Sequence, residues 1–117
     1  MKKFLILSGI AVAALVFANC NSAKKTASTP AAPKSTYATN MTSVITTNCT
    51  PCHIPAKGGN KKAYDNYGNV KSDIDEIIRR IELNPGDRGF MPFKHAKLSD
   101  STINVFKQWK ADGMLEN

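Results

Sequence analysis

Two cysteines and a histidine stand together in the pattern Cys-x-x-Cys-His, formed by Cys49, Cys52 and His53. On a helical turn, two thiols three residues apart can reach the two vinyl groups on one edge of a porphyrin, and the next imidazole can bind the iron. Such an imidazole binds metal through one nitrogen, while the other nitrogen donates a hydrogen bond that fixes the ring. The pattern therefore predicts one covalent haem c, with thioethers at both cysteines and His53 as the proximal iron ligand.

Two other kinds of site use the same residue types. A redox disulfide between Cys49 and Cys52 would accompany the strand–helix pattern of thioredoxin-like folds, and no such pattern surrounds the pair. A zinc site would use both cysteines with His53 and His95. The chain has no second Cys-x-x-Cys and no spaced pair of histidines beside the motif, so both alternatives are weaker interpretations than haem attachment.

A second axial ligand would complete the iron of an electron-transfer haem, and this ligand is commonly a methionine. The candidates are Met41, Met91, His95 and Met114. Met41 lies close before the attachment motif, and Met114 follows the last predicted helix. Met91 lies in a loop with Gly and Pro that could cover the far face of the haem, but a loop methionine also fills gaps in a core. The residues alone leave these two roles of Met91 equally open.

Three short helices are predicted from apolar side chains that recur three and four residues apart. The first covers residues 41–48, with Thr39 or Asn40 as its cap, and runs directly into the attachment motif. The second begins at Ser72, because Ser72 and Asp75 resemble a capping box.

The second helix ends before the Asn-Pro-Gly sequence at residues 84–86, and the third begins near Ser99 and stops at Gly113. The apolar stripe of the second helix consists of Ile74, Ile77, Ile78 and Ile81. One face of the third helix is marked by Ile103, Phe106, Trp109 and Lys110. No segment alternates long enough to form a strand, so the predicted fold class is all-α with three main helices. Such a core is thin, and a domain of this size usually needs a covalent or metal staple.

The order of these motifs resembles the small single-haem class I cytochromes c of bacteria. Such proteins have a short helix, Cys-x-x-Cys-His, a middle helix, Met-Pro, Leu-Ser and a closing aromatic helix. The corresponding pieces here are residues 49–53, 91–92, 98–99 and 109–113, and the resemblance covers residues 39–117. It implies a small cytochrome c-like fold with three main helices packed around one covalently attached haem.

The resemblance also implies the ligand set. Cys49 and Cys52 would hold the haem, His53 would be the proximal ligand and Met91 the distal ligand. His95 is the alternative distal ligand, since it lies only four residues after Met91.

An iron that carries both His53 and Met91 has no open coordination position, so we expect outer-sphere electron transfer and no enzyme activity. The expected partners are a donor and an acceptor redox protein, and we expect the chain to be a monomer. The alternative function is a haem-based sensor or binder of small ligands, in which Met91 is displaceable or does not bind the iron.

The N-terminus has the features of a targeting segment. Two lysines precede an apolar run over residues 4–18, which is typical of a secretory signal peptide. The run is shorter than the roughly 20 residues of a membrane-spanning helix. It ends at Cys20 and resembles a bacterial lipoprotein signal, so we expect removal of residues 1–19 and lipidation of Cys20. An ordinary signal peptide with an incidental cysteine is the alternative.

Residues 20–37 are rich in Ser, Thr, Ala and Lys and are predicted to be a flexible linker behind the lipid anchor, with the haem domain over residues 38–117. This layout places the protein in the bacterial cell envelope, bound to a membrane through its N-terminal lipid. Asn21 stands where Asp would signal retention at the inner membrane, which favours the outer membrane, facing the periplasm.

The positive charge of the chain is concentrated in its N-terminal part. The whole chain has a net charge of +7, but residues 37–117 hold 11 basic and 9 acidic residues, a net charge of +2. A nucleic-acid interface would need clustered charge and interleaved aromatic residues on the folded part, so we expect no nucleic-acid partner.

Overall fold

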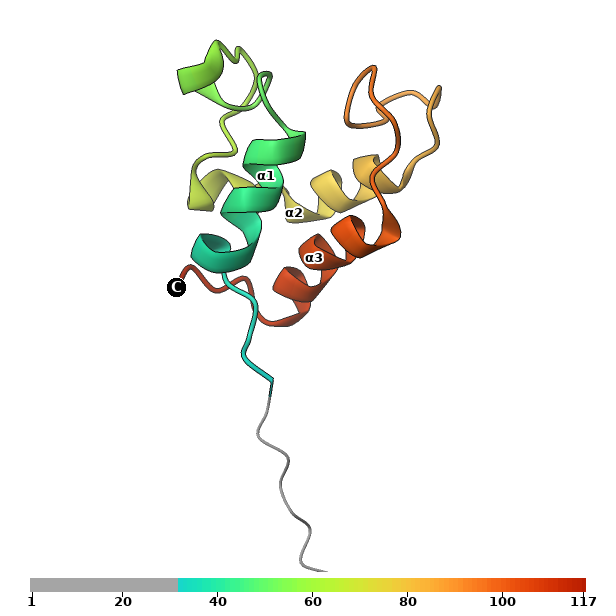
Figure 1. Cartoon of the computed structure of the whole chain (residues 1–117). Helices are drawn as coiled ribbons and strands as arrows, with labels where there is room; N and C mark the ends of the chain where they lie inside the picture. Colours follow the sequence, from blue (N-terminus) through green and yellow to red (C-terminus); the bar gives the residue numbers. More distant parts are fainter. Residues whose placement is uncertain (1–31) are drawn as a thin grey trace, which may run out of the picture. The chain divides into compact units, whose positions relative to one another are not determined.

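This computed structural model describes residues 32–117 of the chain (Figure 1). These residues contain three α-helices and two short helical turns, joined by loops. In chain order the elements are η1 (Tyr37–Met41), α1 (Thr42–Asn48), η2 (Pro55–Lys57), α2 (Tyr67–Glu82) and α3 (Asp100–Ala111). The described part contains no strand beyond an isolated bridge between Thr36 and Leu115, which confirms the all-α prediction there. The predicted signal peptide, Cys20 and residues 20–31 of the predicted linker lie outside the described residues.

The first helical segment begins earlier than the sequence predicted. The Thr36 hydroxyl accepts a hydrogen bond from the backbone N–H of Thr39 at 3.2 Å, and a π-helical turn follows before α1. The predicted cap at Thr39 or Asn40 was wrong, because the Asn40 side chain reaches back and accepts from the Thr36 N–H at 3.0 Å. This reciprocal pair satisfies two donors at the helix start.

Helix α2 also begins earlier than predicted, at Tyr67. The Asn66 side chain is the cap, since it accepts from the backbone N–H of Asn69 at 3.0 Å. The predicted capping box of Ser72 and Asp75 was wrong: Ser72 lies inside the helix, and its hydroxyl donates to the Asn69 carbonyl at 2.9 Å. The earlier start adds a fully buried Val70 to the predicted isoleucine stripe.

Helix α3 agrees with the prediction at both ends. The Ser99 hydroxyl accepts from the backbone N–H of Thr102 at 3.2 Å. The chain leaves the helix through Gly113, whose φ of 96° lies in the left-handed region that favours glycine. Trp109 is fully buried and donates from Nε1 to the Leu115 carbonyl at 2.8 Å, so the C-terminal segment folds back on α3.

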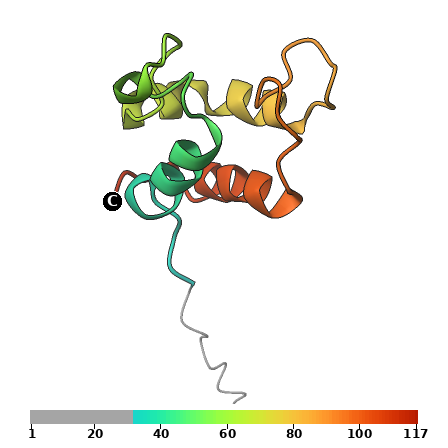
Figure 2. The same ribbon diagram turned by 45° about the horizontal axis from the view of Figure 1, so that its top comes forward.

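The core lies between η1, α1, α2 and α3. The best-buried side chains are Trp109, Phe106, Met41, Ile45 and Val70. Helix α2 packs along α3, and η1 packs on α3 through Tyr37, whose ring centroid lies 6.1 Å from that of Trp109 (Figure 2). This arrangement leaves the loops on either side of α2, residues 49–66 and 83–99, at one end of the unit, while residue 32 lies at the other end (Figure 1).

Candidate functional site

The Cys-x-x-Cys-His motif forms a tight turn at the end of α1. The Cys49 N–H continues the helix by donating to the Ile45 carbonyl at 2.8 Å. The His53 N–H then donates to the Cys49 carbonyl at 3.0 Å, a helical i to i+4 spacing. Both thiols are free; Cys49 is half-buried against the core and Cys52 is exposed. The structure therefore brings both cysteines and His53 onto one turn.

The partial burial of Cys49 affects the ionisation of its thiol. Burial raises the pKa of the Cys49 thiol to about 11, so it is neutral at neutral pH. Nowhere in residues 32–117 do three His, Cys, Asp or Glu side chains gather as a metal site would require. The described residues therefore do not form the alternative zinc site of Cys49, Cys52, His53 and His95.

The orientation of His53 is set by a backbone carbonyl. Its Nδ1 lies 2.8 Å from the carbonyl oxygen of Lys62. A carbonyl oxygen can only accept, so Nδ1 carries the hydrogen, and in the neutral ring Nε2 then has the lone pair. This is the arrangement of metal-binding histidines, in which one nitrogen donates to a carbonyl and the other binds the metal.

The Lys62 carbonyl is held in place because residues 59–64 fold back along the motif. The Lys61 N–H donates to the Cys52 carbonyl at 3.0 Å, and the Tyr64 N–H donates to the His53 carbonyl at 2.9 Å. This backbone pairing continues the Cys-x-x-Cys-His turn into a closed loop. The motif and its supporting segment are thus one structural unit.

A tyrosine covers the imidazole. The rings of His53 and Tyr64 are stacked with centroids 4.4 Å apart and planes 4° apart. The Tyr64 hydroxyl donates to Asp73 Oδ2 at 3.2 Å, and Lys62 Nζ donates to Asp73 Oδ1 at 2.8 Å. Burial and the neighbouring Asp73 carboxylate raise the pKa of Tyr64 to about 12, whereas the hydrogen bond from Lys62 lowers the pKa of Asp73. Tyr64 is therefore a neutral donor and Asp73 a charged acceptor.

Met91 comes from the second loop. Its backbone N–H donates to the Arg80 carbonyl at 3.2 Å, which ties this part of the loop to the end of α2. The Met91 side chain is half-buried and packs against the hydrophobic core, as Cys49 does. The alternative ligand His95 is exposed and lies outside the core cluster.

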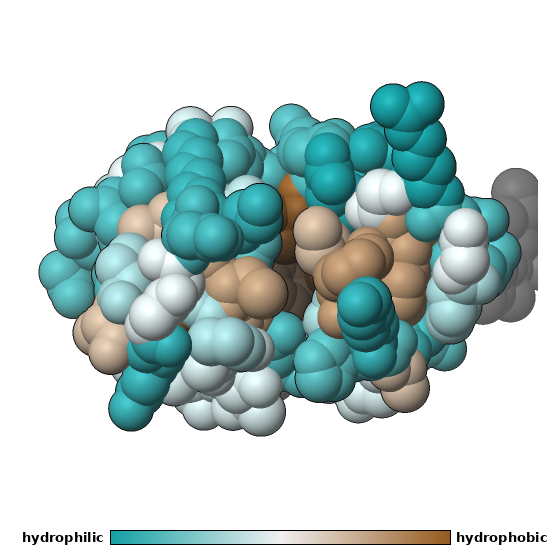
Figure 3. Space-filling view, turned by 90° about the horizontal axis from the view of Figure 1, so that it is seen from above, coloured by the Kyte–Doolittle hydropathy of each residue, from teal (hydrophilic) through white to brown (hydrophobic). Residues whose placement is uncertain are grey.

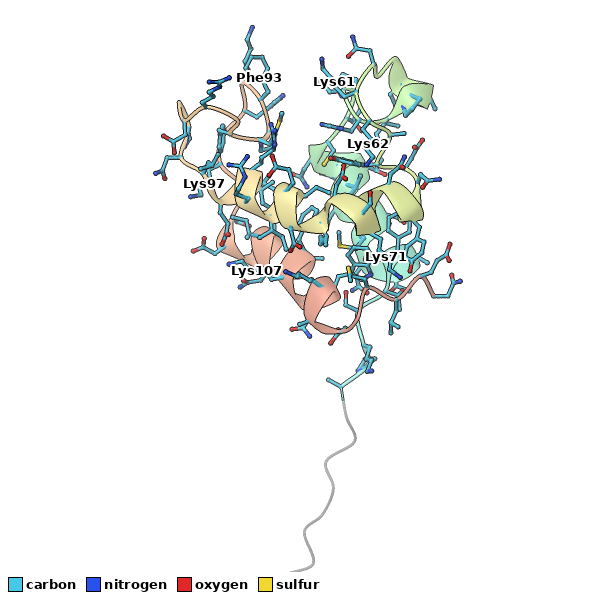
Figure 4. The ribbon with its side chains drawn as sticks, turned by 180° about the vertical axis from the view of Figure 1, so that it is seen from behind. Lys61, Lys62, Lys71, Phe93, Lys97 and Lys107 are labelled. Carbon is cyan, nitrogen blue, oxygen red and sulfur yellow. The ribbon has the colours of Figure 1, made fainter. Side chains whose placement is uncertain are left out.

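The end of the unit that carries the two loops is hollowed, and hydrophobic side chains line much of the hollow (Figure 3). Lys61 from the first loop and Phe93 from the second rise on its two sides (Figure 4). Phe93 is 64% exposed, which is unusual for a large apolar side chain in this unit. Two thiols on one turn, an imidazole with a free Nε2, a thioether on the opposite loop and an apolar hollow together fit a covalently held haem.

Several residues that build this site were missed by the sequence analysis. The acceptor of the His53 hydrogen bond is a backbone atom of Lys62, which has no sequence signature. Asp73 and Tyr64 were not among the predicted site residues. The adjacent glycines at positions 58 and 59 were the one local signal of a close backbone approach.

Comparison of the chain with protein-family models, with curated proteins and with solved structures gives no match. Among the helices of residues 32–117, none has the length and apolar character needed to cross a membrane.

Proposed function

We propose that residues 38–117 form a monohaem c-type cytochrome domain with a cytochrome c-like fold, and that the protein is an electron carrier and not an enzyme. The observation that carries this proposal is the hydrogen bond between His53 Nδ1 and the Lys62 carbonyl, inside a Cys-x-x-Cys-His turn. It leaves Nε2 available as a ligand, which is how iron-binding histidines are prepared.

The two cysteines have separate environments that suit one edge of a porphyrin. Cys49 is half-buried beside the apolar core and Cys52 is exposed at the surface. Each thiol would add across one vinyl group, its sulfur to one carbon and its hydrogen to the other, so the addition needs no oxidant or reductant. The attached group would then supply the staple that a thin three-helix core needs.

Met91 is the proposed distal ligand. It lies on the loop opposite the attachment turn and borders the same core cluster, whereas His95 is exposed. The iron supplies one-electron chemistry when bound, and a thioether ligand favours its reduced state. His53 and Met91 would together hold the iron and leave it no open position for a substrate, and the apolar side chains of the hollow would pack against the porphyrin. A group held in this way would supply one-electron transfer to redox partner proteins.

The N-terminal features support attachment to a bacterial membrane. We propose that residues 1–19 are a signal peptide, that Cys20 is lipidated and that residues 20–37 are a tether in the cell envelope. Residues 32–36 leave the unit at the end opposite the two loops (Figure 1). A tether that leaves there would turn the hollowed end, with the haem edge, away from its anchor and toward redox partners.

The attachment is tested by haem staining after denaturing electrophoresis of the chain made in a host with cytochrome c maturation. The wild-type chain is expected to retain haem, and the double variant Cys49→Ala/Cys52→Ala to lose all of it. Unstained wild-type protein overturns the proposal.

The alternative of a small-ligand sensor is tested on the same material with carbon monoxide. A reduced centre with Met91 bound resists carbon monoxide at neutral pH, whereas rapid binding would assign the sensor function instead.

A further inference from the structure

The imidazole of His53 is held on two sides by residues that share one carboxylate. The Lys62 carbonyl accepts from Nδ1, and the Tyr64 ring lies parallel to the imidazole at 4.4 Å. Both of these residues donate to Asp73, Lys62 through Nζ at 2.8 Å and Tyr64 through its hydroxyl at 3.2 Å. We call Lys62, Tyr64 and Asp73 the His53 brace.

Asp73 holds the brace in place because it lies near the middle of α2, the longest helix of residues 32–117. Its side chain is 26% exposed, and the Ser72 Oγ lies 3.1 Å from its Oδ1. Lys62 and Tyr64, in contrast, belong to the loop before α2, where Figure 4 labels Lys62. A loop alone would allow the ring and the carbonyl to move, whereas two hydrogen bonds to a helix restrict them.

Tyr64 is itself held at three points. Its backbone N–H donates to the His53 carbonyl at 2.9 Å, its hydroxyl donates to Asp73, and its own carbonyl accepts from the Tyr37 hydroxyl at 2.9 Å. The two backbone hydrogen bonds fix the main chain at Tyr64, and the ring cannot swing away from the imidazole without breaking its hydrogen bond to Asp73. A parallel ring at this distance blocks rotation of the imidazole about its side-chain bond.

We propose that Tyr64 and Asp73 are positioning residues, which fix the rotation of the His53 ring and maintain its hydrogen bond to Lys62. This inference rests on the proposed function, because it assigns the brace a role in setting the reduction potential. A firm hydrogen bond at Nδ1 makes the imidazole a stronger electron donor at Nε2. A stronger donor stabilises oxidised iron more than reduced iron, so the brace lowers the reduction potential.

The test uses the haem-loaded full chain and compares three brace variants with two matched controls. The brace variants are Tyr64→Leu, which removes the stacked ring, Tyr64→Phe, which removes only the hydroxyl, and Asp73→Asn. The control for a lost tyrosine hydroxyl is Tyr67→Phe, since the Tyr67 hydroxyl donates to the Met114 carbonyl at 3.0 Å, away from His53.

The control for the charge change is Asp75→Asn, two residues along the same helix, where the carboxylate pairs with Lys110. The reduction potential and the electron paramagnetic resonance spectrum of the oxidised protein are measured for each variant. The spectrum is sensitive to the orientation of the axial ligands.

Tyr64→Leu is expected to weaken the binding of His53 to oxidised iron about tenfold more than its binding to reduced iron. The reduction potential would then rise by about 59 mV, the one-electron equivalent of a tenfold change. Tyr64→Phe and Asp73→Asn are expected to shift the potential in the same direction by less. Tyr67→Phe is expected to lower the midpoint of thermal unfolding without changing the potential or the spectrum, and Asp75→Asn to change neither. An unchanged potential in Tyr64→Leu, or equal shifts in Asp73→Asn and Asp75→Asn, overturns the inference.

Failure of the proposed function gives a different result, because the wild-type chain would then carry no haem. The brace is in that case measured on the same chain through the nitrogen chemical shifts of the His53 imidazole. Wild type is expected to hold the hydrogen on Nδ1, and Tyr64→Leu to distribute it over both nitrogens. Identical shifts in the two chains overturn the inference.

Discussion

Gly59 lies against the backbone of Pro51 so closely that no side chain fits between them. A Cβ atom at position 59 would stand 2.3 Å from the Pro51 carbonyl oxygen and 2.7 Å from that of Cys52. Cβ atoms in proteins do not make contacts this short, and both carbonyl oxygens belong to the backbone of the Cys-x-x-Cys-His turn. The loop that carries Lys62 can therefore return to His53 only if residue 59 is glycine.

Gly59→Ala is expected to push the two backbones apart, because neither obstacle is a flexible side chain. We expect a loss of about 1–3 kcal/mol in the free energy of unfolding and a lower yield of attached haem. The matched control is Gly58→Asn: Gly58 has a φ of 84° but nothing within 4 Å, and Asn tolerates this conformation. Chemical denaturation and haem staining of both variants check the prediction, which equal losses at the two glycines would contradict.

Met91→Ala is expected to open the distal position of the iron. The reduced variant should bind carbon monoxide at least about tenfold faster than wild type, and its reduction potential should fall because the thioether is lost. His95→Ala is the control, since His95 is exposed four residues further on. If His95→Ala opens the site and Met91→Ala does not, the ligand assignment is wrong.

Glu76→Gln is expected to change how the free energy of unfolding depends on pH in the acid range. Hydrogen bonds from Arg79 and Arg80 lower the pKa of Glu76 to about 2 from its ordinary 4.5. Their contribution to stability is therefore complete above pH 4.5 and is lost as the pH falls toward 2. The variant lacks this contribution, so its stability should change less between pH 4.5 and 2.

The same variant is expected to loosen the Met91 loop. A side-chain carbon at Gly89 would lie 3.6 Å from a guanidinium nitrogen of Arg80, so this loop rests on the arginine that Glu76 holds. Chemical denaturation at a series of pH values checks the stability effect, and the visible spectrum reports whether Met91 stays bound. Parallel stability curves for wild type and variant would refute the contribution of Glu76.

Cys20→Ala tests the proposed lipid anchor. A lipidated chain is held by acyl chains that each contribute about 0.8 kcal/mol per buried CH₂, so wild type should sediment with membranes. The variant should move to the soluble fraction or remain unprocessed, with its haem domain intact. Mass spectrometry of the mature N-terminus gives the direct readout, and an unmodified Cys20 in wild type would instead support an ordinary signal peptide.

The sequence predicted those elements that depend only on interactions between residues near each other in the chain. Helix α3 was predicted at both ends because Ser99 and Gly113 act on their own neighbours. The Cys-x-x-Cys-His turn was also predicted, since its spacing alone places the thiols and the imidazole on one turn. The start of α2 was misplaced because Asn66 and Ser72 are both plausible caps, and only packing of Val70 in the core decides between them.

The parts of the site that the sequence could not predict depend on contacts between distant segments. The Lys62 carbonyl reaches His53 across nine residues, and any residue could supply a backbone oxygen. Asp73 and Asp75 look alike in the local sequence, yet Asp73 belongs to the His53 brace and Asp75 pairs with Lys110 on α3. Both residues are helical in the prediction and in the structure, so their roles differ only through the distant segments that each one contacts.

The central claim is tested most directly by optical spectra of the purified mature chain, recorded oxidised and reduced during a potentiometric titration. The account predicts one haem per chain, a low-spin spectrum in both states with the features of His and Met ligation, and a reversible one-electron transition. A chain without haem from a host with working cytochrome c maturation, or a stably high-spin centre, would contradict it. In the first case Cys49 and Cys52 would have to be explained as a thiol site.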